Sequence, residues 1–429
     1  MGVVGPMRGA GALGAAGAAT GLLGGVTADA GAATRGTSAG LPAPGASGIE
    51  HVVVVMMENR SFDHFLGWLP GATGQQAGLT FTDRYGLPHT THHLTEFASC
   101  QFTDPDHSYE GGRIELNGGR CDGWLKAGEN DSLAVGYYTQ PDLAFLGRAA
   151  PAWTVCDQYF SATMAETYPN RFYQHAAQTD RLHNSTATAT MATIWDRLAA
   201  AGVSGRYYFN DVPFTALWGT KYVSISQPFA AFQAAAATGT LPSVSFVDPR
   251  FLDEGSGSSG DDDPKADIRA GEQFLSQVYD AVTTGPGWAN TVLVINFDEW
   301  GGFYDHVAPT TAPAVSPTTA LRGFRVPALV ISPRERRGHA AHDTYDHTSV
   351  LKMIQWRWGL TALTPRDAAA NNLAEVLDFS SAPNLAAPLI TTPPFAATVC
   401  PPEALTGAEQ AEWPALKKKA LDAGWSLPA

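Results

Sequence analysis

The sequence predicts an α/β protein of three layers, in which a mainly parallel sheet is covered by helices on both faces. Two apolar runs rich in β-branched residues, at 49–57 and 291–297, lack the alternation of a half-exposed strand, so each is expected to be buried on both faces. Amphipathic helices are expected at 267–283 and 348–358. Buried strands that alternate with amphipathic helices are typical of a parallel α/β sheet.

Three more strands are expected at 153–160, 243–247 and 326–332. The first helix repeats its apolar residues at helical spacing and is ended by the Thr-Gly-Pro-Gly run that follows it. Gly359 is the expected C-terminal cap of the second helix. By composition, the run SGSSGDDD at 256–263 is expected to be a surface loop.

Residues 1–47 are rich in Gly and Ala, and an apolar stretch is followed there by an Ala-Asp-Ala cleavage-like site. This pattern predicts a signal peptide, with a low-complexity leader as the alternative. One folded domain is expected at 48–429, with an insertion at about 70–150 and a C-terminal tail from about 365. Since no later run approaches the ~20 apolar residues of a membrane-spanning helix, we expect a secreted or extracytoplasmic protein without a transmembrane segment.

The chain is acidic, with 27 Lys and Arg against 41 Asp and Glu and a formal net charge of −14. This balance excludes nucleic acid as an expected partner, because binding it needs a basic surface. The sequence also gives no sign of an obligate protein partner. A site for phosphate in such a chain needs local positive charge, which a bound metal ion can supply.

The four cysteines are Cys100, Cys121, Cys156 and Cys400, and they can pair in three ways. They show no Cys-x-x-Cys spacing, which argues against a zinc knuckle. In an exported chain, a local bridge between Cys100 and Cys121 is the expected pairing. Four buried free thiols are the alternative.

Two of the buried strands end in acidic and amide side chains. Glu58 and Asn59 follow the first strand, and Asp298 and Glu299 follow the strand at 291–297. Ligands of parallel sheets gather beyond the carboxyl ends of the strands, so these groups resemble part of a cation site. Hard oxygen ligands of this kind suit Mg, Ca, Mn or Zn. The alternative is helix capping by Asn59 or Asp298 beside ordinary exposed acids.

A third element is the segment ETYPNR at 166–171. Pro169 suits the first turn of a helix, which puts Thr167 just before the helix N-terminus. Free backbone N–H groups attract phosphate there, and Arg171 could add a fork of donors. A threonine hydroxyl near a cation loses its proton more easily and becomes a nucleophile. The alternative is that Thr167 only caps the helix.

Five segments in order resemble one family, the phosphoesterases that include bacterial phosphatidylcholine-type phospholipases C, plant non-specific phospholipases C and a bacterial acid phosphatase. The segments span about residues 48–360 and read HVVVVMMENRSFDHFLG (51–67), TYPNR (167–171), DEWGGFYDHV (298–307), GFRVPALVISP (323–333) and DHTSVLKMIQWRWG (346–359). The resemblance implies an alkaline-phosphatase-like, three-layer α/β fold.

The resemblance also implies roles for individual residues. The metal ligands would be Glu58, Asn59, Asp298 and Glu299. The catalytic residues would be Thr167 as the nucleophile, His347 as the group that protonates the leaving oxygen, and His107 on the phosphate side. The substrate-binding residues would be Asn170, Arg171 and Asp263.

Asp263 departs from the family pattern, since many members carry histidine there. An aspartate cannot act as a neutral imidazole donor to phosphate at pH 7. The leading hypothesis is a metal-dependent phospholipase C that acts on a choline or ethanolamine phospholipid through phospho-Thr167 and contacts a membrane surface transiently. A broad-specificity acid phosphatase is the alternative, and a catalytically weak binding protein is a third hypothesis.

Overall fold

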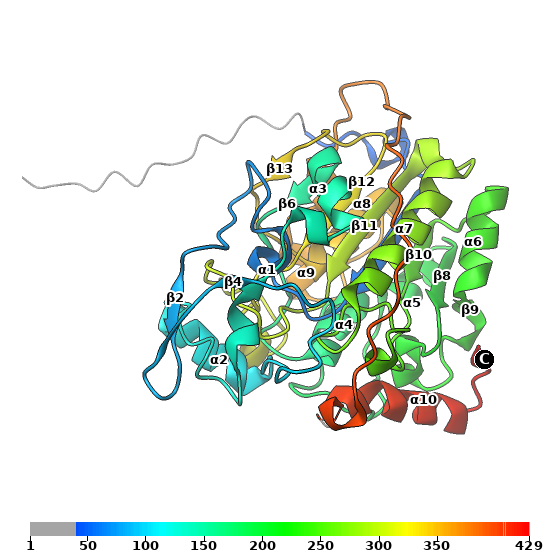
Figure 1. Cartoon of the computed structure of the whole chain (residues 1–429). Coiled ribbons are helices and arrows are strands. Elements are labelled where there is room, and N and C mark those ends of the chain that lie inside the picture. The colour runs from blue at the N-terminus through cyan, green and yellow to red at the C-terminus, as the bar shows by residue number, and fades with distance from the viewer. Residues whose placement is uncertain (1–39, 406, 408, 429) are drawn as a thin grey trace, which may run out of the picture. The chain divides into compact units, whose positions relative to one another are not determined.

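The computed structural model, drawn in Figure 1, describes residues 40–405, 407 and 409–428, and its main sheet has eight strands. In chain order they are β1 (His51–Met57), β6 (Thr154–Cys156), β8 (Gly205–Phe209), β9 (Ser226–Pro228), β10 (Val244–Val247), β11 (Thr291–Phe297), β12 (Ala328–Ile331) and β13 (Ala340–Ala341). Across the sheet the order is β13–β6–β12–β11–β1–β10–β8–β9. Strand β12 is antiparallel to β11 and β6, and the other pairs are parallel. The predicted mainly parallel sheet is confirmed.

Shorter strands pair outside this sheet, and helices surround it. The short pairs are β14 (Tyr345–Asp346) with β7 (Tyr159–Phe160), β2 (Thr80–Thr82) with β3 (Pro88–Thr90), and β4 (His92–His93) with β5 (Gly136–Tyr137). The α-helices of the described part are α1 (Phe62–Leu66), α2 (Tyr109–Leu116), α3 (Leu146–Ala152), α4 (Thr167–Ala176), α5 (Ile194–Ala200), α6 (Phe229–Thr238), α7 (Ile268–Thr284), α8 (His347–Trp358), α9 (Pro365–Ala369) and α10 (Glu412–Asp422).

The long predicted elements lie where the sequence placed them. The helix expected from 267 is α7, and the Asp267 side chain caps it by accepting from the N–H of Arg269. The second expected helix is α8, which ends at Gly359 in the left-handed conformation with φ 65°. The strand expected at 153–160 is wrong in one respect, since it is broken into β6 and β7, which belong to different sheets.

Helices cover both faces of the main sheet, as the three-layer prediction requires. The ring of Tyr207 lies 5.9 Å from His175 of α4, whereas the ring of Tyr208 lies 5.4 Å from Phe232 of α6. Successive side chains of a strand point to opposite faces, so α4 and α6 lie on opposite sides of β8. Helix α6 contacts α7, and α4 contacts α8, which completes the two outer layers (Figure 1).

The loop that the sequence placed on the surface at 256–263 is largely buried, which corrects that expectation. Asp261, Asp262 and Asp263 are at most 4% exposed. The Glu58 N–H donates to the Asp261 carbonyl at 2.8 Å, and the Arg60 guanidinium donates to the next two carbonyls. Composition predicted exposure, but these long-range hydrogen bonds hold the loop under the strand ends.

The predicted insertion at 70–150 carries part of a second, smaller hydrophobic cluster. Trp124 of the insertion packs there with Trp300 and Phe324, which lie outside the insertion. Because Trp124 is fully buried, it is not available for contact with a membrane surface. No described helix has both the length and the apolar content that crossing a bilayer requires. Of the predicted signal peptide or leader at 1–47, residues 1–39 lie outside the described part of the chain. Leu41 packs against the core and Ser47 is buried, so ordered structure begins before residue 48.

The disulfide joins Cys100 to Cys400, which corrects the expected Cys100–Cys121 bridge. Cys121 and Cys156 are free and buried, so the alternative of four free thiols is also wrong. The two bonded cysteines are 300 residues apart because the C-terminal segment returns across the molecule, where the Cys400 N–H donates to the Gly255 carbonyl at 2.7 Å. Spacing in the sequence holds no information about such a return.

Removal of this disulfide in the double variant Cys100→Ser, Cys400→Ser is expected to lower the free energy of unfolding by about 3–5 kcal/mol. The bond closes a loop of 300 residues, which restricts the unfolded chain. Urea denaturation under oxidising conditions measures the effect, and Cys121→Ala is the control for loss of a thiol outside the bond. Equal midpoints for the double variant and the wild type would show that noncovalent contacts alone hold the segment.

Candidate active site

Acidic and amide side chains gather where three neighbouring strands end. They are Glu58 and Asn59 after β1, Asp298 and Glu299 after β11, and Asp248 after β10. Because β1 is parallel to both neighbours, the three carboxyl ends meet at one edge of the sheet. All five side chains are at most 4% exposed. The sequence predicted four of them but missed Asp248, which follows an expected strand in the same way.

Asn59 joins the loops after β1 and β11. Its backbone N–H donates to Asp298 Oδ1 at 3.3 Å, and its Nδ2 donates to Glu299 Oε1 at 2.5 Å. Asn59 has a left-handed backbone with φ 57°, a conformation that asparagine tolerates better than most residues. Gly301, with φ 63°, packs so closely on the Asn59 carbonyl that an added Cβ would overlap it. The sharp turn after the carboxylates therefore requires glycine.

Arg171 of α4 lies among the carboxylates at the strand ends. Its Nε donates to Asp298 Oδ2 at 2.9 Å and its Nη2 to Glu58 Oε1 at 3.3 Å, while Nη1 is 3.6 Å from Asp248 Oδ1. The side chain is 1% exposed. These contacts favour a role as a fixed counter-charge that holds three strand ends together. Binding of substrate by Arg171 stays a prediction.

Burial shifts these carboxyl groups toward their protonated forms. It raises the pKa of Glu58 and of Asp298, and the Arg171 charge acts in the opposite direction. Burial also raises the pKa of Glu299 to about 8 and that of Asp248 to about 6. A raised carboxyl pKa means that the charged form is short of compensating positive charge. A bound cation would supply that charge.

The donor atoms fit a divalent cation of the predicted kind, which is Ca, Mg, Mn or Zn. Glu58, Asp298 and Glu299 offer carboxylate oxygens. Asn59 Nδ2 contacts Glu299 and His107, which leaves Oδ1 as the amide atom available to an ion. Oxygen donors of this type suit hard cations. The side chains at the strand ends therefore fit a divalent cation in their donor atoms and in their charge.

A separate acidic group, Asp63, Asp305 and His306, has ligand atoms that lie within 4.8 Å of one another. Arg325 already provides positive charge there, since its Nε donates to Asp305 Oδ1 at 2.9 Å and its Nη2 to Asp63 Oδ1 at 3.1 Å. His306 Nδ1 is 2.5 Å from Asp63 Oδ2. This group is a network of hydrogen bonds and ion pairs, buried except for His306, that joins α1 to the loop after β11.

Thr167 is the first residue of α4 and is 2% exposed. The helix N-cap is Glu166, without a capping side-chain hydrogen bond, so α4 begins one residue earlier than predicted and Thr167 lies inside it rather than just before it. The alternative that Thr167 only caps the helix is therefore wrong. Residues four apart share a helix face, and Arg171 contacts Glu58 and Asp298. The Thr167 side chain therefore lies on the face of α4 that is turned toward the strand ends.

Asn170 holds the backbone that leads into α4. Its Oδ1 accepts from the Thr163 N–H at 2.9 Å, and its Nδ2 donates to the carbonyls of Ala165 and Glu166 at 2.7 and 3.1 Å. These bonds use both amide hydrogens and the amide oxygen. They favour a role in positioning Thr167, and the predicted contact with substrate stays a prediction.

His107 lies against two of the predicted metal ligands and is 1% exposed. Its Nδ1 is 2.9 Å from the Pro105 carbonyl, which makes Nδ1 the protonated nitrogen. Its Nε2 is 3.1 Å from Asn59 Nδ2 and 3.8 Å from Glu299 Oε1. The structure therefore brings His107 into the group formed by the strand ends, with Nε2 facing it.

His347 contacts the backbone of the site rather than its side chains. It is fully buried, and its Nε2 donates to the backbone carbonyl of Asp298 at 2.7 Å while Nδ1 is 3.4 Å from the Tyr159 hydroxyl. Burial lowers the pKa of His347 to about 4, which keeps the ring neutral at pH 7. This geometry favours a positioning role for His347, and protonation of a leaving group by it stays a prediction.

Asp263 lies among other acids under the strand ends. Its Oδ1 accepts from the Lys265 N–H at 2.7 Å, and the side chain is 4% exposed. Burial first, and then the nearby Asp104 and Asp261, raise its pKa. The structure thus keeps Asp263 beside the site, and substrate binding by it stays a prediction.

The C-terminal helix α10 adds a residue that the sequence analysis missed. Trp413 Nε1 donates to Glu58 Oε2 at 3.3 Å, and its ring stacks on Phe251 with 3.7 Å between centroids. The preceding carbonyl, of Glu412, accepts from the Tyr168 hydroxyl at 2.9 Å. The segment predicted as a tail therefore forms one wall of the site. A tryptophan within a Lys- and Ala-rich run was the one signal for it.

The Trp413→Phe variant is expected to weaken binding of a divalent metal ion about tenfold, because phenylalanine keeps the stack on Phe251 but loses the donor to Glu58. Calorimetric titration of the metal-free protein with Mn²⁺ measures this. Trp425→Phe is the matched control, since Trp425 Nε1 donates to the Gly219 carbonyl on the same C-terminal segment. Equal Mn²⁺ affinities for the two variants would show that the Trp413 donor does not position Glu58.

A family comparison settles what kind of protein this is. The Phosphoesterase family model matches residues 49–361. The chain belongs to the Phosphoesterase family. It is accordingly a hydrolase that acts on phosphoric ester bonds, and the resemblance described from the sequence is confirmed. The matched region runs from β1 to just beyond α8, so α10 and Trp413 lie outside it.

This phosphoesterase has relatives among characterised proteins. It is 31% identical over 457 residues to phospholipase C B of Mycobacterium tuberculosis, with 85% of each chain covered. It is 30% identical over 391 residues to non-specific phospholipase C6 of Arabidopsis thaliana, which covers 80% of this chain and 75% of that one. A solved alkaline phosphatase superfamily protein from Vibrio parahaemolyticus overlaps 89% of each chain at 10% identity, with a TM-score of 0.36.

Proposed function

We propose that this phosphoesterase is a phospholipase C that hydrolyses the phosphodiester of a phospholipid through a phospho-Thr167 intermediate, assisted by a divalent metal ion. One observation supports the proposal most. Thr167 begins α4 on the face it shares with Arg171, and Arg171 contacts the carboxylates of Glu58 and Asp298. The phospholipase C names of the relatives support phospholipid as the substrate.

In the first step, the Thr167 oxygen attacks phosphorus and the bond to the diacylglycerol oxygen breaks. His107 Nε2, which faces the strand ends, gives that oxygen its proton in place of the predicted His347, whose Nε2 is bonded to the Asp298 carbonyl. The metal ion, when bound by Glu58, Asn59, Asp298 and Glu299, would offset charge on the phosphoryl oxygens and favour the ionised Thr167 hydroxyl.

In the second step, water attacks phosphorus and the bond to the Thr167 oxygen breaks. His107 Nε2 takes a proton from the water, and the phosphorylated headgroup leaves. Asn170, through the carbonyls before α4, and His347, through the Asp298 carbonyl, hold the reacting groups in place. The disulfide supports export of the enzyme, because such bonds persist in oxidising compartments. The substrate would be met by transient contact with a lipid surface.

The test is a substrate screen with the purified protein, using phospholipid vesicles and p-nitrophenyl phosphate, before and after removal of metal by a chelator. Release of diacylglycerol that stops on chelation and returns with added metal is expected. Activity confined to p-nitrophenyl phosphate would favour the acid phosphatase alternative. Absence of any hydrolysis with every metal tried would favour the weak binding protein.

A further inference from the structure

Glu412, the first residue of α10, is linked to the start of α4 by one side chain. Its Oε2 accepts a hydrogen bond from Asn184 Nδ2. Asn184 in turn contacts both neighbours of Thr167. Its Oδ1 accepts from the Tyr168 N–H at 2.7 Å, and its own N–H donates to Glu166 Oε2. The Glu412 carboxylate is therefore one side chain away from the backbone on either side of the proposed nucleophile.

The helix alone does not account for Glu412. A carboxylate in the first turn of a helix is stabilised by the helix dipole, and the bond from Asn184 adds to this. The second oxygen, Oε1, makes no hydrogen bond with a described residue, and no described Lys or Arg pairs with Glu412, which is half-buried. Glu412 thus places a negative charge beside α4 that no basic side chain of the described chain neutralises.

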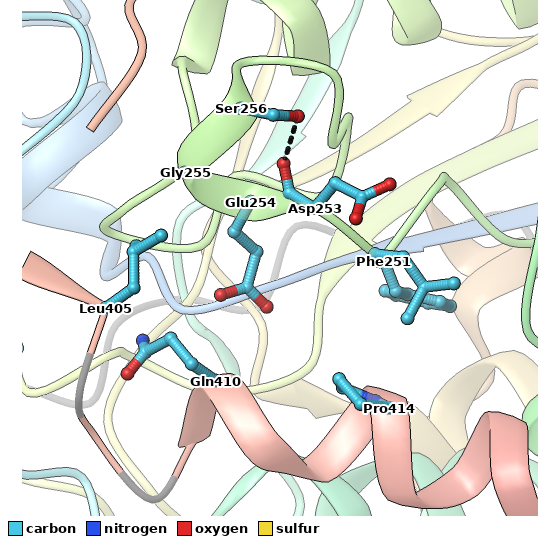
Figure 2. A pocket seen from close by; sticks show the side chains of 9 residues that line it. Phe251, Asp253, Glu254, Gly255, Ser256, Leu405, Gln410 and Pro414 are labelled. Atoms are coloured by element: carbon cyan, nitrogen blue, oxygen red, sulfur yellow. Dashed lines mark hydrogen bonds between the residues drawn. The ribbon is translucent and has the colours of Figure 1, made fainter. Parts of the chain in front are cut away.

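A second unpaired carboxylate, that of Glu254, faces the start of α10. A pocket of about 310 Å³ lies between the loop after β10 and this helix, and two carboxylates line it, those of Asp253 and Glu254 (Figure 2). Asp253 accepts from Arg250 Nη2 at 2.6 Å. The Glu254 carboxylate is bonded to no described residue, although Glu254 is only 7% exposed and points toward the helix (Figure 2). Glu412 and Glu254 are together called the acidic wall.

Electrostatic interactions connect the acidic wall with the candidate active site. Burial raises the pKa of Glu412, and the His107 ring acts in the opposite direction. Further carboxylates raise it more, and they are Asp298, Glu166 and Asp263. The pKa of Glu254 is also raised, by burial first and then by acidic neighbours that include Glu412. A ligand that brings more negative charge to this side of the site meets the same repulsion.

The charge of a phosphoryl group depends on how many of its oxygens are esterified. In-line attack by Thr167 leaves three oxygens in a plane around phosphorus. One of the three is an uncharged ester oxygen in a phosphodiester. In a phosphomonoester it is a charged oxygen, which brings the total to about −1.5 to −2 at pH 7. The predicted metal ligands and Arg171 lie at the strand ends, so the positive charge of the site is on that side and the α10 side is acidic.

Building on the proposed function, we infer that Glu412 is a specificity-determining residue, which together with Glu254 disfavours a phosphoryl group that turns a charged oxygen toward α10. The phosphorylated headgroup that the enzyme releases is itself a phosphomonoester, so the acidic wall also disfavours the product. Hydrolysis then stops after one ester bond, and the product competes weakly with the next substrate. Glu412 lies beyond the segment 49–361 that the family model matches, so the C-terminal segment supplies this selection.

Two esters with the same leaving group, methyl p-nitrophenyl phosphate and p-nitrophenyl phosphate, measure the selection as a ratio of kcat/KM, diester over monoester, at pH 7.5. Glu412→Gln keeps the shape and the acceptor for Asn184 but loses the charge, and it is expected to lower the ratio at least tenfold. Asp422→Asn removes one charge from the other end of α10, where Asp422 pairs with Lys418, and should keep the wild-type ratio. An unchanged ratio in Glu412→Gln would overturn the proposal.

Glu254→Gln provides a second variant, because the Glu254 carboxylate makes no hydrogen bond on which the packing of the described chain depends. It is expected to lower the ratio at least threefold, and the double variant should give a lower ratio than either single variant. Near-UV circular dichroism checks that all variants keep the wild-type packing. A wild-type ratio in a correctly folded Glu254→Gln would remove Glu254 from the acidic wall.

Calorimetric titration with inorganic phosphate in the presence of Mn²⁺ measures the same repulsion without catalysis. Phosphate is expected to bind at least fivefold more tightly to Glu412→Gln than to the wild type, and with wild-type affinity to Asp422→Asn. Weaker phosphate binding by Glu412→Gln would show that Glu412 donates a hydrogen bond to phosphate, and would overturn the proposal.

The two proposals fail in different ways. If neither phospholipid nor methyl p-nitrophenyl phosphate is hydrolysed while phosphate binds more tightly to Glu412→Gln, the proposed function is wrong and the acidic wall stands. If both diesters are hydrolysed and Glu412→Gln changes neither the ratio nor the phosphate affinity, the assignment of Glu412 is wrong and the proposed function stands.

Discussion

Thr167→Ala is expected to remove at least ~99% of phosphoester hydrolysis, which corresponds to about 2.7 kcal/mol or more of activation free energy. The variant lacks the oxygen that is proposed to attack phosphorus, and no other hydroxyl takes the first position of α4. The measurement is kcat/KM on a phospholipid. Acid quenching during turnover, followed by mass spectrometry, should detect phosphate on the Thr167 peptide of the wild type and not of the variant.

Thr167→Ser is the matched control, because it keeps the oxygen and loses one methyl group. It should retain measurable hydrolysis and give a phosphorylated Ser peptide. The far-UV and near-UV spectra of all three proteins should agree, since the side chain replaced is small. If Thr167→Ala kept most of the wild-type rate, the covalent mechanism would be wrong even if the substrate were correct.

Glu58→Gln is expected to remove at least ~99% of the activity together with binding of a divalent metal ion, without lowering the stability of the metal-free protein at pH 8. Burial raises the pKa of Glu58, so the stability linked to its protonated form is present below the unfolded pKa of about 4.3 and is lost as the pH rises through the folded pKa. A glutamine side chain keeps the shape of Glu58 and stays neutral at every pH. The variant therefore lacks the loss of stability with rising pH that is linked to Glu58.

Thermal unfolding at pH 5 and pH 8 measures the stability, and titration with Mn²⁺ measures the metal. The wild type should lose more stability between the two pH values than Glu58→Gln does. Glu50→Gln is the matched control, because this exposed carboxylate precedes the other end of β1. Full Mn²⁺ affinity in Glu58→Gln would contradict the assignment of Glu58 as a ligand.

Local patterns in the sequence predicted the central layer well. Strands β1 and β11 are unbroken apolar runs, and α7 and α8 carry a full helical repeat with clear ends, so each could be predicted without its neighbours. Strand β8 was missed because its five residues, GRYYF, begin with glycine and arginine and show no clear pattern. The position of the site followed from the same local information, since acids at the ends of parallel strands must meet at one edge.

Contacts between distant segments could not be predicted in this way. The disulfide partner of Cys100 and the position of Trp413 at the site both depend on the path of the chain after α8. Arg171 contacts residues that follow three different strands. Its own segment of sequence therefore predicted that it binds substrate rather than Asp298. The burial of Asp263 depends on hydrogen bonds from Arg60, which lies far from it in the sequence.

The contribution of α10 to the site has a consequence for the order in which the enzyme is made. A ribosome that has reached residue 380 has already released every strand of the sheet, α4 and the predicted metal ligands, but neither Cys400 nor Trp413. The indole that contacts Glu58 leaves the ribosome after all of these, and the disulfide that anchors its segment needs an oxidant. Completion of the candidate site therefore waits for α10, and a truncation before Trp413 removes part of one wall of the site rather than an expendable segment.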